Sequence, residues 1–395
     1  MIRFPRRPLP AALLATLAAL SLSLAPVSTQ AQAGTRYQAQ WLEYSKGWSS
    51  SVADYNGDGH DDVWNNGHDR DDRIWFWTPT GYQPGPQVMP YVDRHACAAA
   101  DFNRDHLLDF YCAVGAEKGT GAKLNELWLQ DATGTFKRAV NFGAEDVYGR
   151  GRYPVWLDVN HDGWPDLYLT NESTDREDGQ VNINHLFINQ GGRSFVEQPS
   201  VVTGKRGYQC AGKGDIDGDG WDDLLVCGWA EGNHLFLNNH QGDFVELATP
   251  ATASGWNDAK LVDMNGDGHD DLLVLTQHRF QVWLNTGPGS YFRSPSFDMV
   301  LSSTAVSMTV GDFDGNGRKD VYVVLQDPDC TTSLVDRAPD VVFWGQADGT
   351  YVMQAQPQVD LPGCGHRADT VDGDKVMLEQ GGTGYKGGTY VIRWK

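Results

Sequence analysis

The chain has 395 residues, and its 52 Asp and Glu residues outnumber its 31 Lys and Arg residues, which gives a formal net charge of −21 at pH 7. This balance excludes nucleic acid as an expected partner, because proteins bind nucleic acid through basic residues that contact phosphates. A chain of this length usually forms more than one domain, but a repeat fold can exceed that limit as one unit.

The N-terminal segment, residues 1–33, is predicted to be a secretory signal peptide. Three arginines precede an apolar run over residues 11–25, and Ala31-Gln32-Ala33 offers the small residues of a cleavage site. The run is too short to span a bilayer comfortably, which takes ~20 apolar residues, and no other segment is apolar enough. We therefore expect export, to the periplasm or the outside, of a mature chain over residues 34–395. We expect it to fold as one domain without a transmembrane segment.

An acidic motif of ten residues recurs along the chain. The copies read DYNGDGHDDV from Asp54, DFNRDHLLDF from Asp101, DVNHDGWPDL from Asp158, DIDGDGWDDL from Asp215, DMNGDGHDDL from Asp263, DFDGNGRKDV from Asp312 and, in a decayed seventh copy, TVDGDKVMLE from Thr370. Successive copies are 47 to 58 residues apart. A period near 50 residues is typical of propellers and of solenoids built from small units.

The segments around each motif predict four strands per repeat. A small or apolar stretch precedes the motif, as in CAAAD, and an apolar stretch such as DLLVL follows it directly. A third stretch such as HLFIN or HLFLN comes next, and then a Gly-containing turn with an aromatic residue, as in GDF and SYF. Short runs of β-branched and aromatic residues between Gly and Asn indicate strands. The predicted fold is therefore all-β, a seven-bladed β-propeller with four-stranded blades.

The two ends of the chain are predicted to meet in one blade. The last repeat has strand patterns near residues 375–380 and 388–394, and then the chain stops one strand short. The segment over residues 36–44 precedes the first repeat and has no other place. We expect it to supply the missing outer strand of the last blade, which removes an open edge.

The motif predicts calcium binding. Side-chain oxygens stand at positions 1, 3, 5 and 9, and Gly lets the turn deliver a backbone carbonyl from position 7. Hard, mostly anionic oxygen ligands in a flexible loop suit Ca²⁺ better than Mg²⁺ or zinc. The predicted ligands are Asp54, Asn56, Asp58, His60 and Asp62 in the first loop, Asp101, Asn103, Asp105, Leu107 and Asp109 in the second, Asp158, Asn160, Asp162, Trp164 and Asp166 in the third, Asp215, Asp217, Asp219, Trp221 and Asp223 in the fourth, Asp263, Asn265, Asp267, His269 and Asp271 in the fifth, and Asp312, Asp314, Asn316, Arg318 and Asp320 in the sixth.

Up to six calcium ions with a mainly structural role follow from these loops, because several carboxylates held together without a cation would repel one another. In the seventh copy, Thr370 and Leu378 occupy positions 1 and 9, so we expect no metal there. Arg104 and His161 replace the usual Gly at position 4, and we expect their two loops to bind more weakly.

These repeats resemble the FG-GAP/VCBS repeat family, the calcium-loop propellers of integrin α-subunits and of many secreted bacterial proteins. The resemblance spans roughly residues 45–380, and it rests on the loop, the strand order and the period together. It implies a seven-bladed fold with calcium in a structural role. It does not imply one activity, because one fold hosts many functions.

Six cysteines in an exported chain predict three disulfides. Cys97 and Cys112 flank the second loop at nearly the spacing with which Cys210 and Cys227 flank the fourth, so each pair should face across one hairpin. The two pairs differ by one position, so only one can occupy the wider type of cross-strand pair unless a bulge intervenes. Cys330 and Cys364 lie in loops that should meet on the face opposite the metal loops.

A ligand site is expected at the channel mouth on that opposite face. Basic and aromatic residues stand just before the predicted innermost strands: Trp48, His95, Arg152, Tyr153, Tyr208, Trp256, His366 and Arg367. Aromatic faces stack on sugar rings, and Arg or His pairs with carboxylate or sulfate groups. This pattern predicts binding of a glycan, including an acidic one. The alternative is that the same side chains only cap strands and pack between blades.

Three functions remain open on the sequence. The first is a lectin-like or cell-adhesion module that binds a glycan or a cell-surface or extracellular protein. The second is a polysaccharide lyase or hydrolase, in which His95, Arg152, Tyr208 or His366 would serve at the mouth. The third is a docking scaffold for proteins in the periplasm. No nucleophile elbow, zinc-protease helix or phosphate loop occurs in the sequence, so the enzyme is the less favoured reading.

Overall fold

The computed structural model describes residues 37–43, 49–66, 71–115, 124–172, 181–204, 210–228, 232–250, 255–289, 291–326, 339–353, 361, 364–381 and 387–394. The predicted signal peptide lies outside these residues. Within the described ranges the structure contains no helix long and apolar enough to cross a lipid bilayer.

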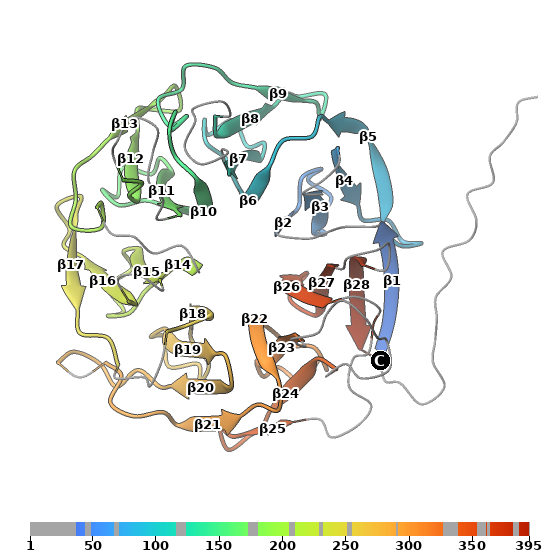
Figure 1. Ribbon diagram of the computed structural model, residues 1–395, viewed down its shortest axis with the longest axis vertical. Helices are drawn as coiled ribbons and strands as arrows, with labels where there is room; N and C mark the ends of the chain where they lie inside the picture. The colour runs from blue at the N-terminus through green and yellow to red at the C-terminus, as the bar shows by residue number, and fades with distance from the viewer. Residues whose placement is uncertain are drawn as a thin grey trace, which may run out of the picture.

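The described residues form seven antiparallel sheets of four strands, arranged as blades around a central axis (Figure 1). From the inside outward, blade 1 contains β2 (Ser49–Ala53), β3 (Asp62–Asn66), β4 (Asp72–Phe76) and β5 (Gln83–Met89), blade 2 contains β6 (Arg94–Ala100), β7 (Asp109–Val114), β8 (Glu126–Gln130) and β9 (Phe136–Arg138), blade 3 contains β10 (Gly151–Leu157), β11 (Asp166–Asn171), β12 (His185–Asn189) and β13 (Phe195–Glu197), and blade 4 contains β14 (Cys210–Gly214), β15 (Asp223–Cys227), β16 (His234–Asn238) and β17 (Phe244–Leu247).

The remaining blades follow the same order. Blade 5 contains β18 (Asp258–Val262), β19 (Asp271–Thr276), β20 (Arg279–Trp283) and β21 (Phe297–Val300), blade 6 contains β22 (Thr304–Gly311), β23 (Asp320–Gln326), β24 (Val341–Gly345) and β25 (Tyr351–Met353), and blade 7 contains β26 (Cys364–Val371), β27 (Lys375–Gly381), β28 (Gly388–Trp394) and β1 (Tyr37–Glu43). The predicted all-β, seven-bladed propeller is thereby confirmed.

The ring closes as the sequence predicts. Strand β1 pairs antiparallel with β28, with Tyr37 opposite Trp394 and Trp41 opposite Tyr390. Figure 1 shows β1, in blue, on the outer side of β28, in red. One blade therefore contains both ends of the described chain, and the closing contacts are backbone hydrogen bonds between segments far apart in the sequence.

The strand sequences follow from each strand's place in its blade. Both faces of a blade are covered by its neighbours, so the second strand has no solvent-facing side. Strands β7, β11 and β19 are accordingly buried at every residue, and they read as continuous apolar runs rather than alternating ones. The innermost strands lie where seven blades converge, and small residues such as those of β6, RHACAAA, fit there.

The hydrophobic core lies between the blades. A cluster of buried side chains fills each junction: Trp64 of blade 1 and Phe110 of blade 2, for example, have ring centroids 3.8 Å apart. The closing junction is filled by Leu42, Met377 and Val391 of blade 7 against Val63 of blade 1. Each blade is thus held mainly by its two neighbours.

The fourth strand of blade 5 differs from its prediction. The motif SYF placed this strand near Phe292, but β21 begins at Phe297, whose ring packs 5.8 Å from Phe280 and 5.8 Å from Phe343. Tyr291 and Phe292 instead lie partly buried against the core between blades 4 and 5. The aromatic residue after the Gly turn therefore did not locate this strand, because the connection between the third and fourth strands of blade 5 is longer than in the other repeats.

Two predicted cysteine pairs are at disulfide distance. Cys97 lies opposite Cys112, and Cys210 lies opposite Cys227, with Cα atoms 4.1 Å and 4.9 Å apart. Each pair bridges the first and second strands of one blade. Of the third predicted pair, Cys364 begins β26 and Cys330 lies outside the described residues.

Candidate metal centres and the channel pocket

The acidic motifs connect the first and second strands of blades 1 to 6. Because the strands of a blade are antiparallel, all these connections emerge on the same face of the ring. We call it the loop face. The segments that lead into the innermost strands run on the opposite face. The predicted mouth residues His95, Arg152, Tyr153, His366 and Arg367 lie within the first residues of β6, β10 and β26 rather than just before these strands.

The Asp at position 1 folds each loop around its own carboxylate. In the first loop, Oδ1 of Asp54 accepts hydrogen bonds from the backbone N–H groups of Gly57, at 2.8 Å, and Asp58, at 3.0 Å, and Oδ2 accepts one from Gly59 at 2.8 Å. Asp215 repeats these contacts in blade 4, with Gly218, Asp219 and Gly220 as donors. The backbone therefore turns tightly around one oxygen cluster.

Two residues per loop lie in the left-handed region of backbone conformation. Position 4 has φ of 74° at Gly57 but 57° at Arg104 and at His161, and position 6 has φ of 70° at His106. Only Gly adopts these values without a steric penalty. Arg104 lies over the ring of Trp164 in the next blade, 5.2 Å from its centroid. The loop of blade 2 is thus the one with strained residues at both positions.

The Asp at position 9 ties each loop to the body of its blade. In blade 4, Oδ2 of Asp223 accepts from the N–H of Ile216 at 2.7 Å, and Oδ1 accepts from the N–H of Asn238 at 2.8 Å. Equivalent contacts to the end of the third strand recur for Asp62, Asp109, Asp166, Asp271 and Asp320. Burial raises the pKa of Asp62, Asp109, Asp166 and Asp223 to about 7, and the pKa of Asp271 and Asp320 to about 6.

The loops gather oxygen atoms closely enough to hold a cation. Carboxylate oxygens of Asp215, Asp217 and Asp223 lie within 4.8 Å of one another, and those of Asp312, Asp314 and Asp320 do the same. Within the described part of the chain, the buried oxygens Oδ1 of Asp217 and Oδ2 of Asp109 have no hydrogen-bond partner. A buried, unpaired carboxylate oxygen is unfavourable unless a cation approaches it. The donor set is all oxygen, which fits Ca²⁺.

The residue at position 3 separates the loops into two kinds. Four loops carry Asn there, and its Nδ2 donates to the position-5 carboxylate at 2.9–3.2 Å: Asn56 to Asp58, Asn103 to Asp105, Asn160 to Asp162 and Asn265 to Asp267. The other two carry Asp217 and Asp314, which cannot donate when ionised. In blade 4, Asp219 instead contacts Nε2 of His240.

The seventh copy is a shorter turn than its alignment predicts. Thr370 and Leu378, the predicted positions 1 and 9, lie inside β26 and β27. Only residues 372–374 connect these strands, and Val371 pairs with Lys375. The two predicted positions face strand neighbours rather than a loop, so the assignment of Thr370 and Leu378 as loop positions is wrong.

The predicted mouth residues do not form one cluster. Trp256 is fully buried in the core between blades 4 and 5, so it is not part of a ligand surface. Trp48 and Tyr208 lie outside the described residues. His95 and Arg152 converge on Gly115, where a Cβ atom would collide with the His95 ring and lie 3.0 Å from Arg152.

Acidic neighbours neutralise the basic mouth residues. Arg152 forms an ion pair with Glu172, and Arg367 pairs with Asp369 at 3.0 Å. Nε2 of His95 lies 3.5 Å from Asp93. Arg152, Arg367 and His95 therefore do not leave an excess of positive charge at the described part of the mouth.

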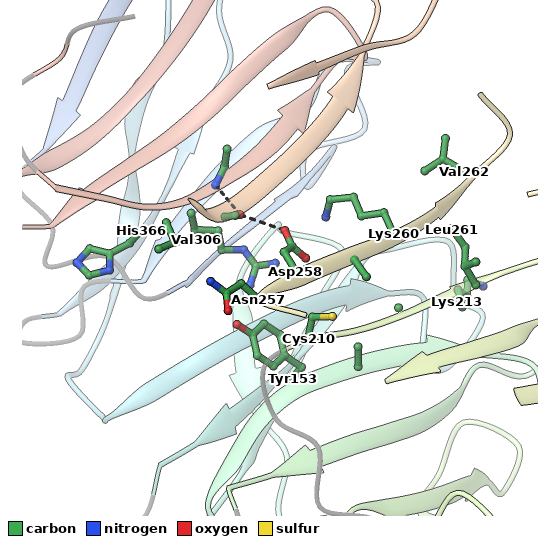
Figure 2. A pocket seen from close by; sticks show the side chains of 16 residues that line it. Tyr153, Cys210, Lys213, Asn257, Asp258, Lys260, Leu261, Val262, Val306 and His366 are labelled. Carbon is green, nitrogen blue, oxygen red and sulfur yellow. Dashed lines mark hydrogen bonds between the residues drawn. The ribbon is translucent and has the colours of Figure 1, made fainter. Parts of the chain in front are cut away.

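Three predicted residues line one cavity, which we call the channel pocket. Tyr153, His366 and Arg367 contribute to its wall together with residues of β14, β18 and β22, and its volume is about 400 Å³ (Figure 2). In Figure 2 the hydroxyl group of Tyr153 points toward Asn257. The guanidinium of Arg367 lies over the Tyr153 ring, 5.6 Å from its centroid.

Sequence reasoning missed the polar residues of the pocket on β18. Asp258 and Lys260 alternate with the more buried Ala259 and Leu261, so this period of two places both polar side chains on one face of β18, and both contribute to the wall of the pocket. Asp258 accepts from the N–H of Met308 at 2.8 Å. The alternation in the segment DAKLV was the signal that would have identified them.

The ionisation of the pocket is shaped by burial. Burial lowers the pKa of His366, so its imidazole is neutral at neutral pH. Burial also raises the pKa of the Tyr153 phenol, so it stays protonated. The pocket therefore offers uncharged hydrogen-bonding groups from these two residues beside the charged Lys260 and Asp258.

Comparisons with known proteins agree with this architecture. The sequence profile of the FG-GAP-like repeat matches residues 54–112, 101–169, 215–274 and 263–323, which together exceed half of the chain. No curated protein sequence matches the chain.

Two solved structures illustrate the similarity in fold. A lectin from Agrocybe aegerita, described as recognising non-reducing terminal N-acetylglucosamine, is 16% identical with a TM-score of 0.53, and the match covers 80% of this chain and 79% of that one. BBS1N, solved in complex with ARL6DN, is 11% identical with a TM-score of 0.55, and the match covers 90% and 94%. At such identities the similarity shows the fold alone.

Proposed function

The chain belongs to the family of FG-GAP-like repeats, and from this premise we propose that it is an exported, calcium-stabilised β-propeller that binds a saccharide in the channel pocket. The gathered carboxylates of Asp215, Asp217 and Asp223 support the binding of calcium. The polar lining of the pocket supports the binding of a saccharide.

Calcium would be held by side chains at positions 1, 3, 5 and 9 of the six loops, and it would supply positive charge that balances the carboxylates. Affinities of extracellular calcium modules lie at about 10⁻⁴–10⁻³ M, which suits an exported protein. At 10 mM calcium each such site would stabilise the fold by about 1.4–2.7 kcal/mol through mass action. The ion would act on the fold, because the loops lie on the face away from the predicted mouth.

The pocket suits a saccharide better than a strongly anionic ligand. Arg367 is already paired with Asp369, and Arg152 with Glu172, so these cations are not available as an excess of positive charge. Asn257, Asp258, Lys260 and His366 offer hydrogen-bond donors and acceptors around a cavity of about 400 Å³. Small-ligand sites are concave and hold a few convergent polar groups. The lectin of similar fold gives an example of a propeller that binds a sugar.

The lyase alternative has one supporting observation. His366 is neutral because burial lowers its pKa, and a neutral imidazole can accept a proton from a substrate. A lyase also needs a cation that neutralises the carboxylate of the sugar, and Arg367 is occupied by Asp369. Binding without turnover is therefore the better-supported function.

A glycan array with the pure protein, in calcium and in EDTA, tests the pocket. A saccharide that binds in calcium should then be titrated against Lys260→Met and His366→Gln. We expect at least about tenfold weaker binding for the two pocket variants. The matched control is Lys137→Met, which removes a lysine from the outer strand β9, where it pairs with Asp131. The control should bind within about twofold of the original protein.

The same experiment contains the results that would overturn the proposal. Absence of any saccharide ligand, or equal binding by the pocket variants and the control, would show that the pocket is not a saccharide site. Release of unsaturated sugar products would show that the protein is a lyase and not only a binding protein. Capture of a protein instead of a glycan would favour the docking scaffold.

A further inference from the structure

Blade 7 replaces the acidic residue of position 9 with a lysine. In blades 1 to 6 the second strand begins with an Asp that pairs with the residue before position 1, as Asp62 pairs with Ala53 and Asp223 with Gly214. In blade 7 the second strand begins with Lys375, which pairs with Val371 in the same register. Lys375 is therefore the structural counterpart of the position-9 carboxylates.

Asp372 is the counterpart of the Asp at position 1. The backbone N–H of Asp215 donates to Oδ2 of Asp270, a residue just before the second strand of the next blade, at 2.8 Å. The N–H of Asp372 donates to Oδ2 of Asp61 in the same way at 2.7 Å, and Asp61 belongs to the next blade around the ring, blade 1. The shortened turn of blade 7 thus keeps the first acidic position.

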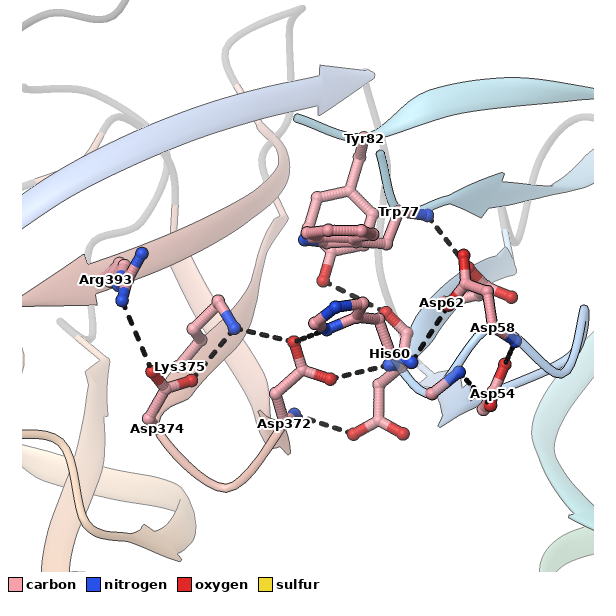
Figure 3. Close-up of polar contacts among 12 residues, drawn as sticks. Asp54, Asp58, His60, Asp62, Trp77, Tyr82, Asp372, Asp374, Lys375 and Arg393 are labelled. Atoms are coloured by element: carbon pink, nitrogen blue, oxygen red, sulfur yellow. Dashed lines mark hydrogen bonds and ion pairs between the residues drawn. The ribbon is translucent and has the colours of Figure 1, made fainter. Parts of the chain in front are cut away.

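The two counterparts form a direct ion pair. Nζ of Lys375 lies 2.6 Å from Oδ2 of Asp372 and 2.9 Å from Oδ1 of Asp374. The side chains of Lys375 and Asp372 are only 14% and 15% exposed, so water screens their attraction less than it screens a surface pair. Figure 3 shows the ammonium group between the two carboxylates. A positive charge carried by the chain therefore stands beside the first acidic position.

The same cluster lies at the seam where the ring closes. The N–H of Asp61 donates to Oδ1 of Asp372 at 2.6 Å, which makes the contact between blades 7 and 1 reciprocal. His60 stacks on Trp77, with ring centroids 3.6 Å apart, and its Nδ1 lies 3.5 Å from Asp372. The hydroxyl of Tyr82 donates to the carbonyl of Asp61 at 3.1 Å. Asp372 is thus fixed from both blades.

We propose that the ammonium group of Lys375 is a built-in cation that takes the place of calcium in blade 7, and that it keeps the closing seam shut when calcium is removed. The inference rests on the proposed calcium sites of the other six blades. An ion in those loops is bound by mass action, so its effect disappears as free calcium falls. The Lys375–Asp372 pair has no such dependence, because both charges belong to the chain.

Hydrogen exchange of the full chain, in calcium and in EDTA, tests this inference blade by blade. Chelation should speed the exchange of β14 and β15 amides at least about tenfold, because blade 4 holds the loop with Asp at all four side-chain ligand positions, 1, 3, 5 and 9. The amides of β27 and β28 should stay within about twofold. Seam amides that lose protection on chelation as much as those of blade 4 would overturn the inference.

A pair of variants separates the lysine from the calcium sites. Lys375→Met should speed exchange at β27 and β28 at least about tenfold, equally in calcium and in EDTA. Lys213→Met is the matched control, because Lys213 also pairs with an acidic residue, Asp222, at 2.9 Å but lies in blade 4, and it should leave the seam unchanged. No effect of Lys375→Met at the seam would contradict the inference. If chelation changes no blade, the calcium proposal fails, and Lys375→Met still decides the role of the ion pair.

Discussion

Asp215 of blade 4 and Asp270 of blade 5 join neighbouring acidic loops by two hydrogen bonds. Oδ2 of Asp270 accepts from the N–H of Asp215 at 2.8 Å, and the N–H of Asp270 donates to the carbonyl of Asp215 at 3.0 Å. Asp222 accepts from the N–H of Asp158 at 2.9 Å in the preceding junction. The loop face is therefore a chain of linked turns, and a change in one loop is expected to affect its neighbour.

Removing the hydrogen bond between Asp215 and Asp270 should lower the stability of the fold. Asp270→Ala deletes a charged acceptor of the Asp215 N–H, and a hydrogen bond to a charged group contributes about 1.5–3 kcal/mol. We expect a loss of that size in urea unfolding, and a smaller loss for Asp270→Asn, which keeps an acceptor oxygen. Asp298→Ala is the control, because its partner Arg279 lies on the exposed outer side of blade 5, and it should change stability by no more than about 1 kcal/mol. Equal losses of unfolding free energy for Asp270→Ala and the control would show that the Asp215–Asp270 hydrogen bond does not stabilise the fold.

The loop of blade 4 should bind calcium more tightly than the loop of blade 2. Asp217 adds a fourth carboxylate at position 3, where blade 2 has Asn103, and a higher ligand charge raises affinity for Ca²⁺. The variant Asp217→Asn should weaken the tightest site about tenfold in isothermal titration and leave the number of sites unchanged. The reciprocal variant Asn103→Asp is the matched control, and it should strengthen a weak site. If Asp217→Asn does not change the affinity of the tightest site, that site lies in a loop of another blade.

Calcium binding should release protons between pH 6 and pH 7. Burial raises the pKa of Asp109 and Asp223 to about 7 in the calcium-free protein, so these groups are partly protonated in that range, and the ion requires their ionised form. Titrations at pH 6.5 in buffers of different ionisation heat should show this release, which should vanish at pH 8.5. Equal proton release at both pH values would contradict the raised pKa.

The same pKa shifts set the sign of a second effect. A carboxyl group with a raised pKa in the folded state binds protons more tightly there than in the unfolded state. In EDTA, these groups therefore favour folding more at pH 5.5 than at pH 8, and the free energy of unfolding should fall as pH rises through about 7. In calcium this trend should weaken or reverse. A rise with pH in EDTA would count against the assignment.

Relieving backbone strain in blade 2 should stabilise the protein. His106 has φ of 70° at position 6, where blade 4 has Gly220 with φ of 84°. His106→Gly should raise the free energy of unfolding by about 0.5–1 kcal/mol, because Gly adopts this conformation without penalty. Gly220→Ala should lower it by a similar or larger amount, although a Cβ there meets no other atom within 4 Å. Denaturant titrations of the two variants should therefore differ in sign.

A buried arginine near the mouth is expected to be structural. Arg94 is 1% exposed, and its guanidinium pairs with Asp72 at 2.6 Å and with Glu126 at 2.7 Å. Arg94→Met would remove the buried guanidinium from both carboxylates, although Arg138 stays 3.4 Å from Glu126, and breaking a buried ion pair costs about 3–5 kcal/mol. Thermal unfolding should show that loss, whereas saccharide binding per folded molecule should stay unchanged. A selective loss of binding without a loss of stability would move Arg94 into the ligand site.

The repeat made the fold predictable from the sequence. The spacing of the motifs gives the number of blades, and the fixed distance from each motif to the next apolar run gives the strand order. Ring closure followed from the leftover segment over residues 36–44, which forms β1 (Tyr37–Glu43), and from a blade that lacked one strand. Local patterns were sufficient because each blade repeats the same packing.

The candidate sites were less predictable because no sequence motif marks the side chains that contact one another. Glu172, the partner of Arg152, comes just after β11, and Asp369, the partner of Arg367, lies two residues farther along β26. Trp256 carries no sign in the sequence that it packs between blades. The seventh turn was misaligned because the sequence pattern aligned Thr370 with position 1, whereas the backbone hydrogen bonds of the structure place Asp372 there.

Metal analysis of the purified chain tests the central claim most directly. In equilibrium dialysis at about 10 mM calcium, we expect up to six bound calcium ions per chain, with one fewer in Asp223→Ala. EDTA should lower the midpoint of thermal unfolding by at least about 10 °C, because each site contributes about 1.4–2.7 kcal/mol at 10 mM calcium. Protein that binds no calcium in this dialysis and unfolds at the same temperature in EDTA would contradict a calcium-stabilised fold.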